Sequence, residues 1–260
     1  MRILLTNDDG YQAAGIRALY EALCEVADVI VVAPESEQSA VSLGITLTKP
    51  LRAKSIDHTG MKGYCINGTP GDCIKLALHG LLDYKPDFIF SGINQGSNVG
   101  LNANYSGTVA GAVEGAMNEV PAIAMSLLSY TSRDFSGATH AARWVLDRLK
   151  GDSLLPPYHV LSVNVPPMPK GELKGIRVAP VSQVVYREVV DKRLDPREND
   201  YYWLGGAWHE ISPTEGGDHE MTSEGYVAVT PLKIDWTARK VLQTLKQAGW
   251  DEEWNGKGEG

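Results

Sequence analysis

The chain has 260 residues, of which 43% are hydrophobic and 22% charged, which is typical of a folded globular protein. Its net charge of -8 excludes strong attraction to a phosphate backbone, so we expect no nucleic-acid polymer as a partner. We expect no secretory signal and no membrane segment, because the chain has neither a basic and apolar leader nor about 18 consecutive apolar residues. Three cysteines without CxxC spacing predict free thiols and a cytoplasmic location: Cys24, Cys65 and Cys73.

Residues 1 to 165 alternate between short apolar runs and segments with helical spacing. Strands are expected at 2–6, 28–34, 86–92, 120–127 and 159–167, with a more exposed pair at 45–53 and 61–67. Helices are expected around Ile16 to Val26, after the Thr69-Pro70 start signal, over 108–117 and over 139–150. The alternation predicts a Rossmann-like, mostly parallel sheet with helices on both faces, which places sites at the carboxyl ends of its strands.

Beyond residue 170 the pattern changes to strands without intervening helices. Strands are expected at 177–190, 201–211 and 225–232, with a polar loop at 212–224 and a final helix over 237–247. This predicts a catalytic core at 1–170 and a β-rich C-terminal extension at 171–260, which ends in a helix and packs on the same domain. Five tryptophans of this part would fill a small satellite core or anchor a subunit contact: Trp203, Trp208, Trp236, Trp250 and Trp254.

Oxygen-bearing side chains follow three of the predicted strands. Asp8 and Asp9 close the first strand, Ser39 lies in the loop after the second, and Asn94 follows the third. An isolated Asp-Asp-Gly is equally compatible with a polar turn in which an aspartate caps the next helix. Two adjacent carboxylates repel each other, however, and a hard cation relieves the repulsion. The combined set favours Mg²⁺ or Mn²⁺, with Ca²⁺ as a tolerated occupant, over zinc or copper.

A candidate phosphate site follows directly in the chain. Ser106, Gly107 and Thr108 precede a helix of small residues, and a helix N-terminus with free N–H groups and hydroxyls binds anions. Gly96 and Asn98 of the preceding glycine-rich loop are assigned to the same site. An ordinary Ser/Thr cap is the alternative. A hard cation beside a phosphate cradle is the minimum apparatus for phosphoryl transfer to water. P-loop, GxSxG and GxGxxG motifs are absent.

Five ordered motifs resemble the SurE (survival protein E) family of metal-dependent nucleotidases and phosphatases: TNDDG, ESEQSA, GTPGDC, SGINQGSNVG and YSGTVAGAVEGAM. The resemblance implies a Rossmann-like core with a C-terminal arm used for homodimer or homotetramer assembly. It implies one divalent cation on Asp8, Asp9, Ser39 and Asn94, and phosphate contacts from Ser106, Gly107 and Thr108. The implied reaction is hydrolysis of nucleoside 5′- or 3′-monophosphates, with short polyphosphate as a further substrate of some members.

One departure from the family pattern concerns Leu43-Gly44, which stands where members often carry a His-containing pair. The departure leaves a non-catalytic nucleotide-binding or assembly protein as an alternative. A phosphorylatable receiver module is disfavoured, because its phosphate-accepting aspartate is replaced here by the Ser91 to Asn94 segment. Since no residue presents itself as a covalent nucleophile, the preferred mechanism is direct attack by water, with Asp8 or Asp9 as the proton acceptor.

Overall fold

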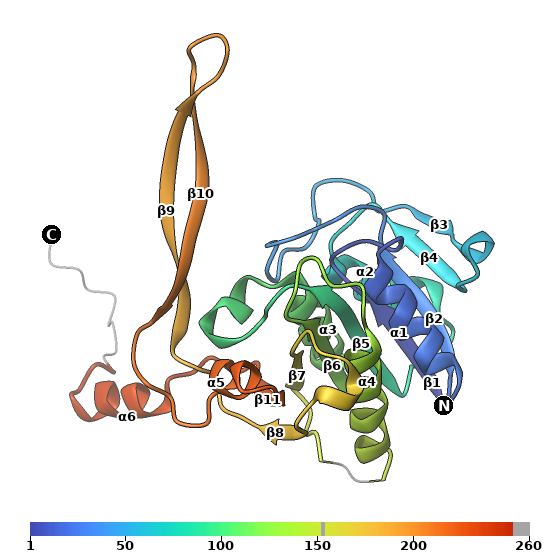
Figure 1. The fold of residues 1–260 in the computed structure, drawn as a ribbon. Coiled ribbons are helices and arrows are strands. Elements are labelled where there is room, and N and C mark those ends of the chain that lie inside the picture. The colour runs from blue at the N-terminus through green and yellow to red at the C-terminus, as the bar shows by residue number, and fades with distance from the viewer. Residues whose placement is uncertain (152–153, 252–260) are drawn as a thin grey trace, which may run out of the picture.

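Five buried apolar strands form the centre of one nine-stranded sheet in the computed structural model, which describes residues 1–151 and 154–251 (Figure 1). All five run parallel, in the order β2-β1-β5-β6-β7. Their bounds are β1 (Arg2–Thr6), β2 (Asp28–Pro34), β5 (Phe88–Gln95), β6 (Ala122–Leu127) and β7 (His159–Val165). The predicted mostly parallel sheet is therefore confirmed.

Shorter strands extend the sheet at both edges. On one side β4 (Gly63–Ile66) pairs parallel with β2, and β3 (Ala53–Ser55) pairs antiparallel with β4. On the other side β11 (Val227–Lys233) pairs antiparallel with β7, and β8 (Ile176–Val178) pairs parallel with β11. The strand expected at 45–53 is wrong except at its last residue. Two of its backbone N–H groups donate to side chains, Thr46 to Asp72 and Arg52 to Asn67, and Pro50 has no N–H to donate to a ladder.

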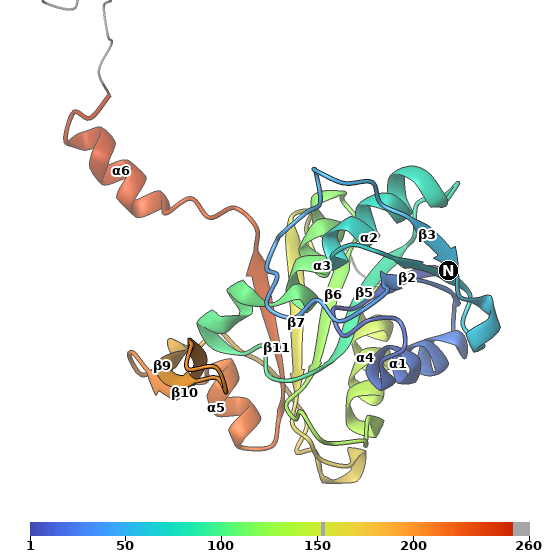
Figure 2. The same ribbon diagram turned by 90° about the horizontal axis from the view of Figure 1, so that it is seen from above.

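Two layers of helices cover the sheet (Figure 2). One face carries α1 (Ala14–Cys24) and α4 (Ser136–Leu149), and the other carries α2 (Pro70–Leu76) and α3 (Gly107–Met117). Helix α2 begins at a capping box in which Thr69 and Asp72 exchange hydrogen bonds, and it continues into a π-helical turn, η2 (Ala77–Leu81). Three short 3₁₀ segments complete the core: η1 (Asp57–Thr59), η3 (Gly100–Tyr105) and η4 (Lys170–Glu172).

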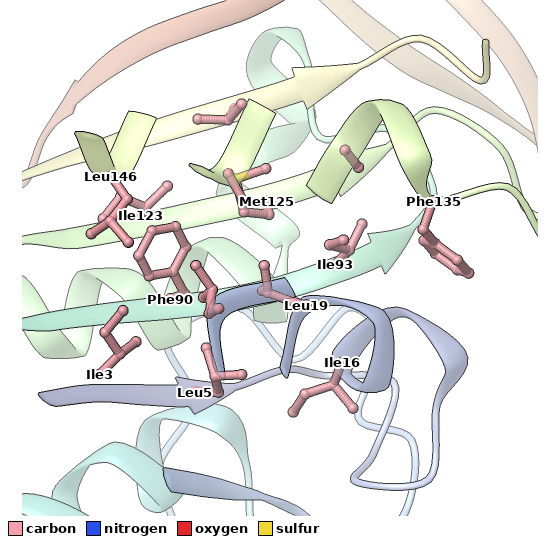
Figure 3. Close-up of a cluster of buried hydrophobic side chains, with 14 of the residues drawn as sticks. Ile3, Leu5, Ile16, Leu19, Phe90, Ile93, Ile123, Met125, Phe135 and Leu146 are labelled. Carbon is pink, nitrogen blue, oxygen red and sulfur yellow. The ribbon is translucent and has the colours of Figure 1, made fainter. Parts of the chain in front are cut away.

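The core is divided by the sheet into two clusters. Side chains alternate along β1, so Ile3 and Leu5 face α1 and α4, whereas Leu4 faces α2 and α3. Figure 3 shows the first cluster, in which Phe90 packs among the side chains of β1, β6 and α1. Because both faces of the central strands are buried, the strand ends at the sheet edge are held in fixed positions.

The C-terminal part contains a long hairpin that stands away from the sheet (Figure 1). Its strands, β9 (Val184–Leu194) and β10 (Asp200–Glu210), pair with each other along their whole length. The predicted strand at 177–190 is therefore two strands, β8 and β9, and the break between them contains Ser182, whose N–H donates to the Asp218 carboxylate.

Two short helices complete this part of the chain. Helix α5 (Asp218–Ser223) lies in the segment expected to be a polar loop, so that expectation is wrong over 218–223, whereas 212–217 form neither helix nor strand. The Asp218 carboxylate is buried and accepts the N–H groups of Gly100 and Ser182, contacts that local sequence does not reveal.

Helix α6 (Arg239–Gln247) has no buried residue, and no helix of the described residues is long and apolar enough to span a membrane. Four of the five C-terminal tryptophans are exposed and form no satellite core: Trp203, Trp208, Trp236 and Trp250. Trp254 lies outside the described residues.

Candidate active site

The acidic pair lies at the point where the strand order reverses. The chain proceeds from β1 to β2 on one side and returns to β5 on the other, so the connections after β1 and β5 leave in opposite directions. Open parallel sheets bind ligands in the crevice at such a point, outside the carboxyl ends of the strands. Asp8 and Asp9 follow β1 directly, and Asn94 and Gln95 end β5 beside them.

Asp8 is a buried carboxylate, held by contacts far apart in the sequence. The Thr108 hydroxyl donates to Asp8 Oδ1 at 2.5 Å, and the Gln38 N–H donates to the Asp8 carbonyl at 2.7 Å. A Cβ at Gly107 would lie 2.8 Å from Asp8 Cβ and 2.9 Å from its Oδ2. Position 107 therefore accepts only glycine without a shift of Asp8, and the start of α3 presses directly against the acid.

Burial makes the charge on this pair costly. It raises the pKa of Asp8 from 3.8 to about 6, although hydrogen bonding from Thr108 lowers it, and the neighbouring Asp9 charge raises it further. The pKa of Asp9 is also raised, first by burial and then by the charge of Glu37, against a hydrogen bond from the Gln95 N–H at 3.2 Å. The crevice thus holds more negative charge than its own hydrogen bonds neutralise.

The segments that carry Ser39 and Asn94 meet this pair. Ser39 is exposed and donates to Glu37 Oε1 at 2.6 Å, and the adjacent Gln38 is bonded to Asp8. Asn94 uses its Nδ2 to donate to the Gly96 carbonyl at 3.0 Å, so its Oδ1 accepts no hydrogen bond within the described residues. Sequence reasoning missed Glu37, although it lies two residues before Ser39 in the quoted ESEQSA motif.

The five predicted phosphate-binding residues lie around the start of α3 and the loop after β5. Ser106 is the N-cap of α3 and accepts the Val109 N–H at 3.1 Å, and the Thr108 hydroxyl is committed to Asp8. Gly96 has a positive φ of 148° and lies against Tyr130. Asn98 is buried and donates to Ser126 Oγ at 2.8 Å. The Ser106 hydroxyl therefore caps α3, as the alternative of an ordinary Ser/Thr cap expected. The contacts of the five residues with phosphate stay a prediction.

The donor atoms of the crevice fit a hard cation. Asp8 Oδ2 and Asp9 Oδ1 accept no hydrogen bond within residues 1–151 and 154–251. Asn7, beside them, is fully buried, and its Oδ1 has no hydrogen-bond partner. Over the same residues no cluster of three or more His, Cys, Asp or Glu side chains forms. Unpaired oxygen acceptors next to two carboxylates suit Mg²⁺ or Mn²⁺ better than a metal that prefers nitrogen or sulfur ligands.

The fold and this crevice define a Rossmann-like α/β protein with an acidic oxygen-donor site at the switch point of its sheet. The family model described as Survival protein SurE matches residues 3–188, and the chain belongs to this family.

Curated relatives match over nearly the full length. The chain is 42% identical over 246 residues to the 5′-nucleotidase SurE of Nitratidesulfovibrio vulgaris (strain DP4), covering 94% of this chain and 98% of the relative. It is 40% identical over 247 residues to the 5′-nucleotidase SurE of Heliobacterium modesticaldum, covering 94% and 90%. The crystal structure of the SurE protein from Aquifex aeolicus superposes with a TM-score of 0.83 at 37% identity, covering 96% of this chain and all of that one. The predicted family and fold class are confirmed.

Proposed function

We propose that the protein is a metal-dependent phosphomonoesterase that hydrolyses nucleoside 5′- and 3′-monophosphates, and also short polyphosphate, releasing phosphate. The observation that carries the proposal is the pair formed by the buried Asp8 and the half-buried Asp9 at the switch point of the sheet, with Asp8 in contact with the N-terminus of α3. The names of the curated relatives support a 5′-nucleotidase as the enzyme class.

The cation would be held by Asp8, Asp9, Ser39 and Asn94. It would be Mg²⁺ or Mn²⁺, with Ca²⁺ as a tolerated occupant. The free oxygens of the two carboxylates and the unpaired Oδ1 of Asn94 support this assignment. When bound, the cation supplies positive charge next to the phosphate and acidifies water. It also removes the electrostatic cost of keeping two carboxylates ionised in one buried crevice.

The start of α3 would bind the phosphate. Gly107 has no side chain, so the first turn of α3 packs closely against Asp8 and the positive end of the helix lies beside the acidic pair. Ser106, Thr108, Gly96 and Asn98 complete the proposed cradle. Water attacks phosphorus, and Asp8 or Asp9 accepts a proton of this water at its free carboxylate oxygen. The bond from phosphorus to the nucleoside oxygen breaks, and this oxygen takes the bonding electron pair and a proton from solvent to leave as the alcohol.

The C-terminal part would serve assembly. We assign 1–170 to the catalytic core and 171–260 to an arm that forms a homodimer or homotetramer. The amphipathic helix α6, which has no buried residue, and the exposed apolar side chains along the hairpin support this assignment, because such surfaces mark protein contacts. The three free thiols support a reducing cytoplasm as the location.

The test is phosphate release from nucleoside 5′- and 3′-monophosphates and from tripolyphosphate, with Mg²⁺, Mn²⁺ or EDTA. We expect metal-dependent release that falls at least about 100-fold in Asp9→Asn, since a carboxylate at the reacting centre is lost. Asp147→Asn, which removes an exposed carboxylate of α4, is the control and should keep full activity. Folded protein that releases no phosphate with any metal would contradict the proposal and favour a non-catalytic nucleotide-binding protein.

A further inference from the structure

A cavity that Asp8 does not line lies beside the N-terminus of α3. It has a volume of about 270 Å³ and is enclosed by α3, the loop after Ser39, η3, the end of β11 and the segment that follows β11. Ser106 belongs to its wall, and the next residue of the chain, Gly107, lies against Asp8. One helix start is therefore shared by the acidic crevice and this cavity.

The helical repeat explains how α3 serves both sites. Positions 106, 109, 110 and 113 follow the i, i+3, i+4, i+7 spacing of one helix face, and this face lines the cavity. Gly107 and Thr108 face Asp8, and Gly111 lies against Thr6 and Ser91 of the sheet. A molecule whose phosphate lies at the start of α3 can thus extend along the helix into the cavity.

The chemistry of the lining selects the class of ligand. The floor is apolar and buried, with Val109, Ala110 and Val113 each less than 10% exposed. The rim carries two exposed apolar side chains, Leu43 and Trp236, and Trp236 is 77% exposed although it lines the cavity. An exposed tryptophan at the mouth of an apolar cavity offers a stacking surface for a flat ring.

We propose that this cavity binds the nucleobase of the substrate, by apolar contact with α3 and by stacking on Trp236. The proposal rests on the proposed function, because the phosphate must lie at the start of α3 for the base to reach the cavity. A volume of about 270 Å³ is below the usual lower limit of about 300 Å³ for a drug-sized ligand, so it suits one ring system and not a whole nucleotide. Apolar contacts discriminate bases mainly by size, which predicts a purine preference of no more than about 100-fold.

The position of Leu43 bears on the departure from the family pattern noted in the sequence. Leu43 lies at the cavity rim, four residues after Ser39. A leucine at this place adds apolar surface where a histidine would add a polar ring. The replacement therefore acts on recognition of the base and leaves the phosphate and cation groups as they are.

The test compares nucleotides with an ester that has no ring. KM and kcat are measured for AMP, CMP and glycerol phosphate in the wild type, Trp236→Ala and Leu43→Ser. We expect Trp236→Ala to raise KM for AMP about tenfold and to leave KM for glycerol phosphate within about twofold. Leu43→Ser should act in the same direction with a smaller change. Trp250→Ala and Leu47→Ser remove exposed residues of the same types that do not line the cavity, and they should leave all KM values unchanged.

A binding measurement separates this proposal from the proposed function. Titration of 2-aminopurine riboside, a fluorescent nucleoside without phosphate, reports occupancy of the cavity without any turnover. Quenching by the wild type that is lost in Trp236→Ala supports the nucleobase site even if no ester is hydrolysed. Equal KM changes for AMP and glycerol phosphate would overturn it. So would a change in oligomer size in Trp236→Ala without a change in KM, which would assign the cavity to a subunit contact.

Discussion

Replacing Asp8 with asparagine should stabilise the metal-free protein. The pKa of Asp8 rises from 3.8 to about 6 on folding, so the folded chain holds this proton more tightly than the unfolded chain. The proton on Asp8 makes its full contribution to the free energy of unfolding below pH 4. This contribution declines as the pH rises from about 4 to 6 and is absent at neutral pH. At pH 7.5 the ionised folded state therefore carries a penalty of about 3 kcal/mol.

The variant removes this penalty while keeping the local contacts. Asparagine has the same shape, and its Oδ1 can still accept the Thr108 hydroxyl that Asp8 accepts at 2.5 Å. Burying the new amide N–H₂ without a partner costs about 1 kcal/mol. The expected net gain in the free energy of unfolding is about 2 kcal/mol at pH 7.5. At pH 5 the linkage relation leaves about half of the penalty, so the gain should fall to about 0.5 kcal/mol.

The assay is urea unfolding in EDTA at the two pH values, followed by the same titration with Mg²⁺. A cation at 100 times its dissociation constant stabilises the wild type by about 2.7 kcal/mol and should leave the Asp8→Asn variant unchanged. Asp218→Asn is the matched control, since this buried carboxylate accepts backbone N–H groups of Gly100 and Ser182. The Asp218→Asn variant should have a lower free energy of unfolding than the wild type. Equal stability of wild type and Asp8→Asn in EDTA at both pH values would refute the reasoning.

Two further predictions concern the same crevice, and a third concerns the loop that follows Ser39. Gly107→Ala should displace Asp8 and weaken Mn²⁺ binding at least about tenfold, as measured by calorimetry. Unchanged affinity would show that the start of α3 moves and Asp8 stays in place. Thr108→Val removes a donor to the ionised carboxylate and should raise the pKa of Asp8 further by about one unit in a metal-free NMR titration, whereas Thr108→Ser should not. Asp72→Ala leaves the N–H groups of Thr46 and Thr69 unpaired, so it should lower the free energy of unfolding by about 3 kcal/mol. It should also accelerate hydrogen exchange over 41–47. Exchange as slow as in the wild type would contradict this prediction.

The sequence predicted those parts of the structure that depend on local patterns. The apolar run of β1 and its two closing acids, the Thr69-Pro70 helix start and the small-residue helix α3 are each encoded within a few neighbouring residues. Their parallel arrangement follows from the alternation of strands and helices. This is why the edge of the sheet that carries Asp8 and Asp9 could be located before the structure.

Features that depend on distant contacts could not be predicted. Helix α5 is only six residues long, and its first residue is buried by backbone groups 36 and 118 positions away. The Thr108 hydroxyl meets Asp8 across 100 residues, and no local pattern indicates that it is bonded to an acid and not free for phosphate. The position of α3 between the acidic pair and the neighbouring cavity likewise appears only when the C-terminal segment is placed beside the helix.

The long hairpin has a consequence for unwanted association. Two extended strands with unpaired outer edges and exposed valine, tyrosine and leucine side chains are the kind of surface on which chains aggregate. Its outer half is charged, with Lys192 paired to Asp200 and Arg193 to Asp191 across 2.7 and 2.6 Å. A strand adding to this edge must satisfy or displace these charges. The outer half of the hairpin therefore presents charged and apolar side chains together, and only a surface that matches both is expected to pair with it.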